Sequence, residues 1–333
     1  MVKCRHVAFA LALLGCRAGA QVARTAPGWR VVADVELPGK PARFDYQSFD
    51  PTTGRLWIAH MGAGEVLAFD VRTRQVVAGV PNMPGVTGVR AVSALERVFV
   101  ALSAGHAVAV LDSRSGRVLA RAPGGRFPDG LDYATRVDKL YVSDESGRQE
   151  LVIDVPSFTA HRSIPLGGEA GNTHYDPVAG RLWVAVQTRN ELAAIDPGTD
   201  SVVERIPVPG IERPHGFYLD APRRFIYVTG EANGRVGVLN LQTSRMTHIY
   251  PVGDEPDVLA MDPDRHRLFV ASESGVIAAF SAQGDSLVPL PSYHAAAAHS
   301  VAVDPATHLV YVPLANVAGK PVLRILQLDW GGS

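Results

Sequence analysis

Acidic and imidazole side chains recur at one fixed position of a repeat in this chain. Seven aromatic residues mark the repeat, and three Asp and two His lie twelve positions before five of them: Asp45, Asp129, His215, Asp257 and His299. Carboxylates held close together repel one another unless a proton or a cation lies between them. Two imidazoles with several carboxylates form a suitable ligand set for a divalent metal ion. The pattern therefore predicts a site for a cation or a small polar ligand.

A second set of polar residues lies four positions after the same aromatic residues. Three of its members are acidic: Glu145, Glu231 and Glu273. Because all three share one offset, we expect them around the rim of the same site. Other residues beside the first set suit an anionic or sugar-like group, and we take three of them as ligand-binding candidates: Tyr46, Arg90 and Asn172.

A metal ion at this site would take His215, His299 and Asp257 as its ligands, because imidazole and carboxylate together suit a divalent cation. The competing interpretation is local: Asp and His before Gly make turn hydrogen bonds at the start of a strand, and the Glu residues are solvated. Equal offsets indicate a shared level and not contact, so the sequence leaves both interpretations open. No Ser-His-Asp elbow, Gly-rich phosphate loop or Cys-containing haem motif accompanies these residues.

The elements that position these residues follow from the aromatic repeat. Its members are 42 or 44 residues apart, and each lies between two apolar residues. They are Trp57, Phe99, Tyr141, Trp183, Tyr227, Phe269 and Tyr311. A period of about 40–50 residues built from short strand-like runs is typical of the blades of a β-propeller. Seven repeats therefore predict seven blades.

Most repeats hold four strand-like runs, but the last repeat lacks its fourth. The run at 29–35 precedes the first complete blade and can supply the missing strand, which closes the ring and removes its open edges. We therefore predict an all-β protein, with one seven-bladed β-propeller domain at 29–333, four-stranded blades and a last blade closed by the N-terminal strand. The innermost strand of each blade lines a central channel, so the Asp and His set is expected at one mouth of that channel.

Two of the repeats carry a recognisable pattern, in which an apolar strand and Asp or Asn follow the segments Tyr227-Val228-Thr229-Gly230 and Tyr141-Val142-Ser143-Asp144. Over about residues 29–330 the chain resembles the YVTN-repeat β-propellers, the YncE-like group. The resemblance implies the propeller fold. The resemblance does not indicate one function, because related propellers serve as binding proteins, lyases, lactonases and haem carriers.

The first 20 residues indicate export. Lys3 and Arg5 precede an apolar run at 7–14 that is too short to span a bilayer as a helix. Two processing interpretations stand side by side: an Ala-x-Ala cleavage site at 18–20, or a lipobox that makes Cys16 a lipid-bearing N-terminus. Residues 21–28 are expected to form a flexible leader. We therefore expect a periplasmic or secreted protein, attached to a membrane only where Cys16 carries a lipid.

Composition excludes several classes of function. The two cysteines, Cys4 and Cys16, both lie in the leading segment, so the mature domain has no disulfide and no thiol nucleophile. Without the first 20 residues, 29 basic residues face 33 acidic ones, which is poorly suited to neutralising nucleic-acid phosphates. Nucleic-acid binding is therefore supported only by the resemblance.

Two function hypotheses remain. The first is a periplasmic ligand-binding or scaffold protein that uses the channel mouth, with a small molecule or a periplasmic protein as its partner. The alternative is a divalent-metal-assisted hydrolase or lyase, lactonase-like, in which the ion polarises a carbonyl group and a nearby His or Glu moves a proton. In either case we expect a monomer.

Overall fold

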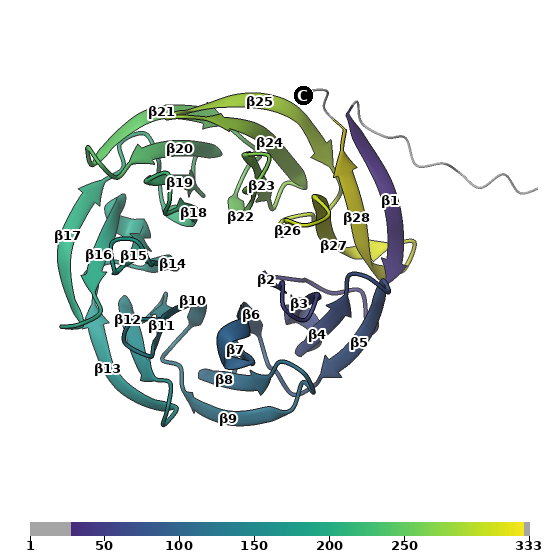
Figure 1. Ribbon diagram of the computed structural model, residues 1–333, viewed down its shortest axis with the longest axis horizontal. Coiled ribbons are helices and arrows are strands. Elements are labelled where there is room, and N and C mark those ends of the chain that lie inside the picture. Colours follow the sequence, from purple (N-terminus) through teal and green to yellow (C-terminus); the bar gives the residue numbers. More distant parts are fainter. Residues whose placement is uncertain (1–27, 330–333) are drawn as a thin grey trace, which may run out of the picture.

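Seven four-stranded antiparallel sheets are arranged as a ring in the computed structural model, which describes residues 28–329 (Figure 1). One edge strand of each sheet lies nearest the central axis of the ring, where the inner strands line cavities that we call the channel, and the opposite edge strand forms the outer wall. The predicted all-β, seven-bladed architecture is confirmed. The signal segment, Cys16 and nearly all of the predicted leader lie outside the described residues.

The strands follow the chain blade by blade. The first blade holds β2 (Gln47–Asp50), β3 (Arg55–His60), β4 (Glu65–Asp70) and β5 (Gln75–Val80). The second holds β6 (Val86–Val92), β7 (Arg97–Leu102), β8 (Ala107–Asp112) and β9 (Val118–Pro123). The third holds β10 (Pro128–Ala134), β11 (Lys139–Asp144), β12 (Gln149–Asp154) and β13 (Thr159–Pro165). The fourth holds β14 (Ala170–Asp176), β15 (Arg181–Val186), β16 (Glu191–Asp196) and β17 (Ser201–Pro207).

The remaining blades continue this order. The fifth holds β18 (Pro214–Asp220), β19 (Phe225–Gly230), β20 (Arg235–Asn240) and β21 (Arg245–Pro251). The sixth holds β22 (Pro256–Asp262), β23 (Arg267–Ser272), β24 (Val276–Gln283) and β25 (Ser286–His294). The seventh holds β26 (Ala302–Asp304), β27 (Leu309–Val317), β28 (Lys320–Leu328) and β1 (Trp29–Glu36).

Short 3₁₀ helices occupy three of the connections, and each ends at a residue with left-handed backbone. They are η1 (Met61–Ala63), η2 (Ser93–Leu95) and η3 (Gln187–Arg189). No helix within 28–329 has the length and apolar character needed to cross a membrane.

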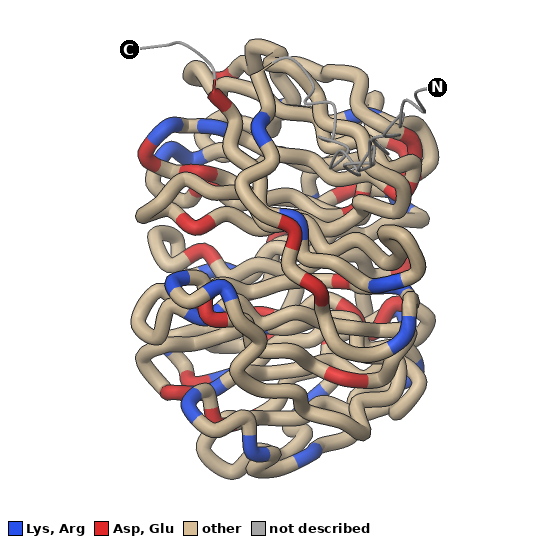
Figure 2. The backbone as a smooth tube through the Cα atoms, turned by 90° about the vertical axis from the view of Figure 1, so that its right-hand side faces the viewer, with Lys and Arg blue, Asp and Glu red and all other residues tan. Residues whose placement is uncertain are grey.

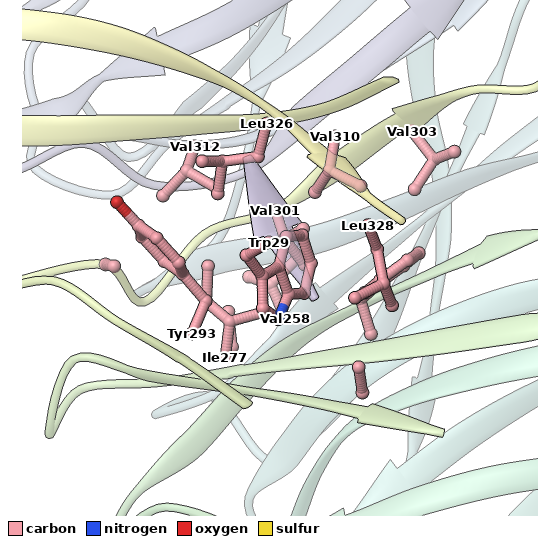
Figure 3. Packing of buried hydrophobic residues seen from close by; sticks show 14 of the residues in the cluster. Trp29, Val258, Ile277, Tyr293, Val301, Val303, Val310, Val312, Leu326 and Leu328 are labelled. Carbon is pink, nitrogen blue, oxygen red and sulfur yellow. The ribbon is translucent and has the colours of Figure 1, made fainter. Parts of the chain in front are cut away.

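The N-terminal strand closes the ring. β1 pairs antiparallel with β28 from Trp29 opposite Leu328 to Glu36 opposite Val322, so both ends of the described chain share the seventh blade. The Trp29 indole also donates a 2.7 Å hydrogen bond to the Pro291 carbonyl of the sixth blade. In Figure 3 its ring lies among side chains of the sixth and seventh blades. The predicted closure is confirmed.

The hydrophobic core lies between the blades. Seven clusters of buried apolar residues occupy the seven blade-to-blade interfaces, and each contains one aromatic of the repeat. All seven aromatics are at most 3% exposed. Middle strands such as β3 and β7 are apolar on both faces because a neighbouring blade covers each face. Outer strands such as β13 are mostly exposed and polar.

Basic and acidic residues are interspersed over the side of the ring in Figure 2, without a large area of one sign.

Candidate functional site at the channel mouth

Irregular starts of the inner strands aim side chains into the channel. In five blades the pairing of the inner strand with its neighbour shifts register near its first residues. The residues inside these shifts include Thr87, Asp129, Gly171, His215 and Asp257. Bulges of this kind bend a strand and redirect a side chain. The offset seen in the sequence therefore corresponds to a register shift near the start of the inner strand, which recurs in five of the blades.

Glycine allows the inner strands to approach one another at this level. A Cβ atom at Gly216 would lie 1.7 Å from the carbonyl oxygen of Asp257, and one at Gly88 would lie 2.1 Å from that of Asp129. Real Cβ atoms do not come so close to backbone, so only glycine fits. The close approach brings Asp and His side chains of different blades within a few ångströms of one another.

The cavity at this mouth has a volume of about 360 Å³. We call it the mouth cavity; the predicted site residues that line it are Asp45, Tyr46, Asp129, Glu145, His215, Glu231, Asp257 and Glu273. Arg43, Met61, Thr87, Phe127, Glu255 and Pro256 complete its lining. Most of the predicted set thus shares one cavity, with the three Glu residues among its lining.

His215 is the centre of a hydrogen-bonded group in this cavity. Its Nε2 lies 3.5 Å from Asp129 Oδ2 and 3.4 Å from Asp257 Oδ1. The same nitrogen is 3.3 Å from the Tyr46 hydroxyl, which donates a 3.2 Å hydrogen bond to Asp257. On the other side of the ring, Nδ1 lies 3.1 Å from the amide nitrogen of Gln187.

The charges of this group determine its protonation. Burial lowers the pKa of His215, but the hydrogen bond and charge of Asp257, with the charge of Asp129, outweigh burial and raise that pKa to about 10. The Gln187 amide opposes this shift, because its N–H group faces Nδ1 and its oxygen accepts a 2.7 Å hydrogen bond from Arg213. Burial raises the pKa of Asp129 to about 7 although His215 lowers it. Whether the His215 ring is neutral, with Nδ1 accepting from Gln187, or protonated on both nitrogens, Nε2 carries a proton that faces the carboxylates.

A second group joins Asp45, Asp257 and His299. One ligand atom from each lies within 4.8 Å of the others. His299 is 3% exposed, and its Nε2 has no hydrogen-bond partner among the described residues. Burial, and then the charges of Asp257 and Asp129, raise the pKa of Asp45 well above its ordinary value. Burial likewise favours the neutral form of His299 by lowering its pKa. A neutral imidazole has a lone pair that can bind a metal ion.

Of the predicted metal ligands His215, His299 and Asp257, the structure brings His299 and Asp257 together in this group. Asp45 joins His299 and Asp257, while His215 does not belong to the group. Both ring nitrogens of His215 already face partners, and its Nε2–H points at carboxylates instead of offering a lone pair. His299 itself is buried beside Asp45 and Asp257 and is not among the residues that line the mouth cavity.

Two predicted residues lie at another place. Arg90 and Asn172 line a second cavity of about 280 Å³, deeper in the channel, which we call the inner cavity. Tyr46 lines both the mouth and the inner cavity and so lies between them. Arg90 is three positions further along its strand than Thr87, and that distance carries its side chain away from the mouth.

Three further residues, which the sequence analysis did not select, contact the predicted site residues, and one of them, Arg43, lines the mouth cavity. Arg43 Nη1 lies 2.6 Å from Glu273 Oε1, and its Nη2 lies 4.0 Å from Asp257. Gln187 shares the offset of the rim Glu residues and could have been included on that signal. Arg213 contacts Gln187 and lies 3.4 Å from Glu231, but no repeated offset marks it.

Comparison with known proteins gives the fold. No family model and no curated protein matches the chain. Among solved structures, Kuenenia stuttgartiensis hydrazine synthase has a TM-score of 0.71 and 17% identity, covering 93% of this chain and 99% of that chain. Virginiamycin B lyase from Staphylococcus aureus has a TM-score of 0.74 and 12% identity, covering 90% and 99%.

The RRP9 WD40 repeats have a TM-score of 0.74 and 11% identity, covering 91% of this chain and 98% of that chain. At such identities these similarities show the fold and no activity. They support a seven-bladed β-propeller, and no family match accompanies the resemblance to the YncE-like group.

Proposed function

We propose that this chain is a ligand-binding β-propeller that holds a divalent cation at the channel mouth through Asp45, Asp257 and His299. One observation carries the proposal: three ligand atoms converge within 4.8 Å, and one comes from a buried imidazole whose Nε2 has no hydrogen-bond partner among residues 28–329. A buried polar atom without a hydrogen-bond partner costs free energy, which a bound ion, water molecule or ligand offsets.

The charge around this group favours a cation. Asp45, Asp129, Asp257 and Glu273 provide four carboxylates, whereas the cationic side chains beside them are Arg43 and His215. Three protein ligands leave further coordination positions of an ion open toward the mouth cavity. A small molecule with oxygen donors can bind at those positions, which gives the cavity a ligand-binding role.

Manganese binding tests the proposal. Protein freed of metal with a chelator is titrated with Mn²⁺, and free Mn²⁺ is followed by electron paramagnetic resonance. We expect Asp45→Asn and His299→Gln each to weaken Mn²⁺ binding at least about tenfold, because each loses one ligand. Glu255→Gln is the matched control, since Glu255 lines the same cavity outside the group. Equal Mn²⁺ affinity in the wild type and all three variants would show that no ion binds there.

A second candidate function is metal-assisted hydrolysis or elimination. The observation that favours it is the position of Tyr46 and His215, which contact each other and Asp257 in the same cavity. A proton-transferring pair beside a Lewis acid is the arrangement such reactions need. The similar fold of a lyase is compatible with this candidate but does not assign it.

Turnover separates the two candidates. A panel of lactones and esters is incubated with the Mn²⁺-loaded protein, and product is followed by chromatography. An enzyme should lose turnover in His215→Ala while it retains Mn²⁺, because His215 is outside the group of ligands. Saturable Mn²⁺ binding without turnover of any substrate would leave the ligand-binding role alone.

We also propose that the protein acts outside the cytoplasm, because residues 1–20 have the pattern of an export signal. Fractionation of cells that express the full chain tests this, and mass spectrometry of the mature N-terminus distinguishes cleavage after Ala20 from lipid attachment at Cys16.

A further inference from the structure

We call the seven residues twelve positions before the repeated aromatics the mouth ring, and the inner strands carry another ring of side chains three positions beyond it. Across the seven blades it consists of Ser48, Arg90, Asp132, His174, Tyr218, Ala260 and Ala302. The ring is polar on blades one to five and small on blades six and seven. The two alanines help to line the inner cavity and leave space opposite the polar side chains.

A third cavity opens where the inner strands end, and its volume is about 530 Å³. We call it the opposite cavity, because it lies at the far ends of the strands whose first residues form the mouth. It shares Arg90, His174, Tyr218 and Met261 with the inner cavity. The two cavities therefore adjoin and form one depression. Tyr46 is the one lining residue that the mouth cavity shares with the inner cavity.

Asp132 organises this depression without presenting its charge to a ligand. Its side chain is 5% exposed, and its oxygens accept hydrogen bonds from the backbone N–H groups of Tyr133 and Tyr175 at 2.8 and 2.9 Å. Arg90 Nε lies 2.8 Å from Oδ1, and His174 Nδ1 lies 3.8 Å from Oδ2. Burial raises the pKa of Asp132, but these partners outweigh burial and hold that pKa at about 2. The carboxylate thus stays ionised and positions a cation and an imidazole beside it.

Arg90 and Tyr218 present hydrogen-bond donors to the cavity. Arg90 contacts Asp132 through Nε and its side chain is 47% exposed, which leaves its terminal amino groups accessible. The Tyr218 hydroxyl makes no hydrogen bond with any residue of the described chain, and burial raises its pKa to about 12, so it remains a donor. His174 is 35% exposed, with its ring held edge-on against Phe217 at 4.7 Å.

The remaining acidic group of the opposite cavity is already neutralised. Asp220 Oδ1 accepts a hydrogen bond from the backbone N–H of Arg223, and Oδ2 lies 3.5 Å from the Arg223 guanidinium. The rest of the wall is largely apolar: Tyr175, Pro177, Leu219, Ala221, Pro222, Met261 and Pro263 line it together with His266.

We propose that the opposite cavity binds a small organic carboxylate, with the carboxylate on Arg90 and Tyr218 and an apolar body against Leu219 and Met261. An Arg fork with a neighbouring hydroxyl donor matches the two oxygens of a carboxylate. The apolar wall adds affinity for an aromatic or aliphatic body that an inorganic anion lacks. This site is separate from the cation site at the mouth.

Benzoate is the probe, and benzamide is its uncharged match. Chelator-treated protein is titrated with each by isothermal calorimetry, so that no metal ion can bind the carboxylate at the mouth. We expect benzoate to bind at least about tenfold more tightly than benzamide. We further expect Arg90→Gln to weaken benzoate binding about tenfold or more, which corresponds to loss of one charge-assisted interaction.

Tyr218→Phe should weaken benzoate binding about threefold or more and keeps the test valid where Arg90→Gln fails to fold. Arg97→Gln is the matched control: Arg97 is 38% exposed and lies 3.8 Å from Asp112, outside the channel cavities. The double variant Asp45→Asn, His299→Gln should bind benzoate like the wild type, which separates this site from the mouth.

Three results would overturn the proposal. They are absence of saturable benzoate binding by the wild type, unchanged binding in folded Arg90→Gln or Tyr218→Phe, and displacement of benzoate by inorganic phosphate at equal concentration. The last would show that the apolar wall contributes nothing.

Discussion

At the scale of single residues, Glu150 shows how a charge-bearing group is kept inside this fold. It is 0% exposed on β12, and neither carboxylate oxygen has a hydrogen-bond partner among residues 28–329. Burial, with a smaller contribution from the charge of Asp144, raises the pKa of Glu150 well above its ordinary value. The nearby Thr173 offsets this only in part, because its hydroxyl donates to the Trp183 carbonyl. The folded protein therefore holds Glu150 protonated where the unfolded chain ionises it.

The contribution of Glu150 to the stability of the fold falls as pH rises. A raised folded-state pKa means that stability is complete below about pH 4, the unfolded value, and is lost as pH rises toward the folded pKa. Glu150→Gln removes this loss. We expect the variant to match the wild type near pH 4 and to exceed it by about 1–3 kcal/mol near pH 8. Urea unfolding at the two pH values measures the difference, and a gap that does not widen with pH would contradict the assignment.

Tyr46 permits a test at the mouth. Its hydroxyl donates to Asp257, one of the three proposed cation ligands. Partners of this kind orient a metal ligand, and their loss costs about tenfold in affinity. We therefore expect Tyr46→Phe to weaken Mn²⁺ binding about tenfold while the melting temperature changes little, because the partly buried ring stays. Unchanged Mn²⁺ affinity would mean that the hydrogen bond from the Tyr46 hydroxyl does not orient Asp257 for metal binding.

At the scale of elements, the irregular starts of the inner strands decide where the site side chains point. Glycines at these strand starts allow neighbouring inner strands to approach one another closely. We expect Gly216→Ala to push β18 and β22 apart, because the new Cβ would meet the Asp257 carbonyl oxygen at 1.7 Å. The variant should lose most Mn²⁺ affinity and several degrees of melting temperature. The control is Gly79→Ala on the outer strand β5, where the nearest atom is 3.8 Å away. Equal behaviour of the two variants would argue against a positional role for Gly216.

The aromatic residue of each second strand has a different role, which is to fill a blade interface. Trp183 is 3% exposed in the cluster between blades four and five. Trp183→Ala should cost about 3–5 kcal/mol of unfolding free energy, the range for removal of a large buried aromatic. Denaturant unfolding measures it. A change below about 0.5 kcal/mol, as at a surface position, would remove Trp183 from the core.

At the scale of the whole molecule, closure depends on one strand from the N-terminal end. Deleting residues 1–36 removes β1, exposes the edge of β28 and takes Trp29 out of its cluster. Unpaired edges template association, so we expect the shortened protein to aggregate or to melt at a clearly lower temperature. Deletion of residues 1–26 is the control because it leaves β1 intact. A monomer with unchanged melting temperature after the longer deletion would contradict strand-based closure.

The fold could be predicted because its determinants are periodic. Trp57 and its six counterparts each occupy one interface, and the missing strand of the last blade had a matching run at 29–35. The site could be predicted only in part. An equal offset fixes the level of a side chain along the channel, but not which neighbour it faces, so Asp45 was not distinguished from His215 as a partner of His299.

Arg90 shows the other limit of sequence reasoning. It lies close to the mouth ring in sequence, yet three residues of extended strand carry it to the next cavity. Arg213 was omitted because its role depends on a contact between blades that no local pattern records, whereas Gln187 carried the offset of the rim Glu residues but its contact with His215 could not be read from it.

The pairing of β1 with β28 also has a consequence in time. Trp29 meets Leu328, so the first strand of the described chain must wait for almost the last. At about 5–20 residues per second, a ribosome needs on the order of 15–60 s to make the chain between them. During that interval β1 has no partner in its own blade, and six blades can form before the seventh. The seventh blade therefore cannot close before β28 has been made, and until β1 and β28 meet the edge of that blade stays open.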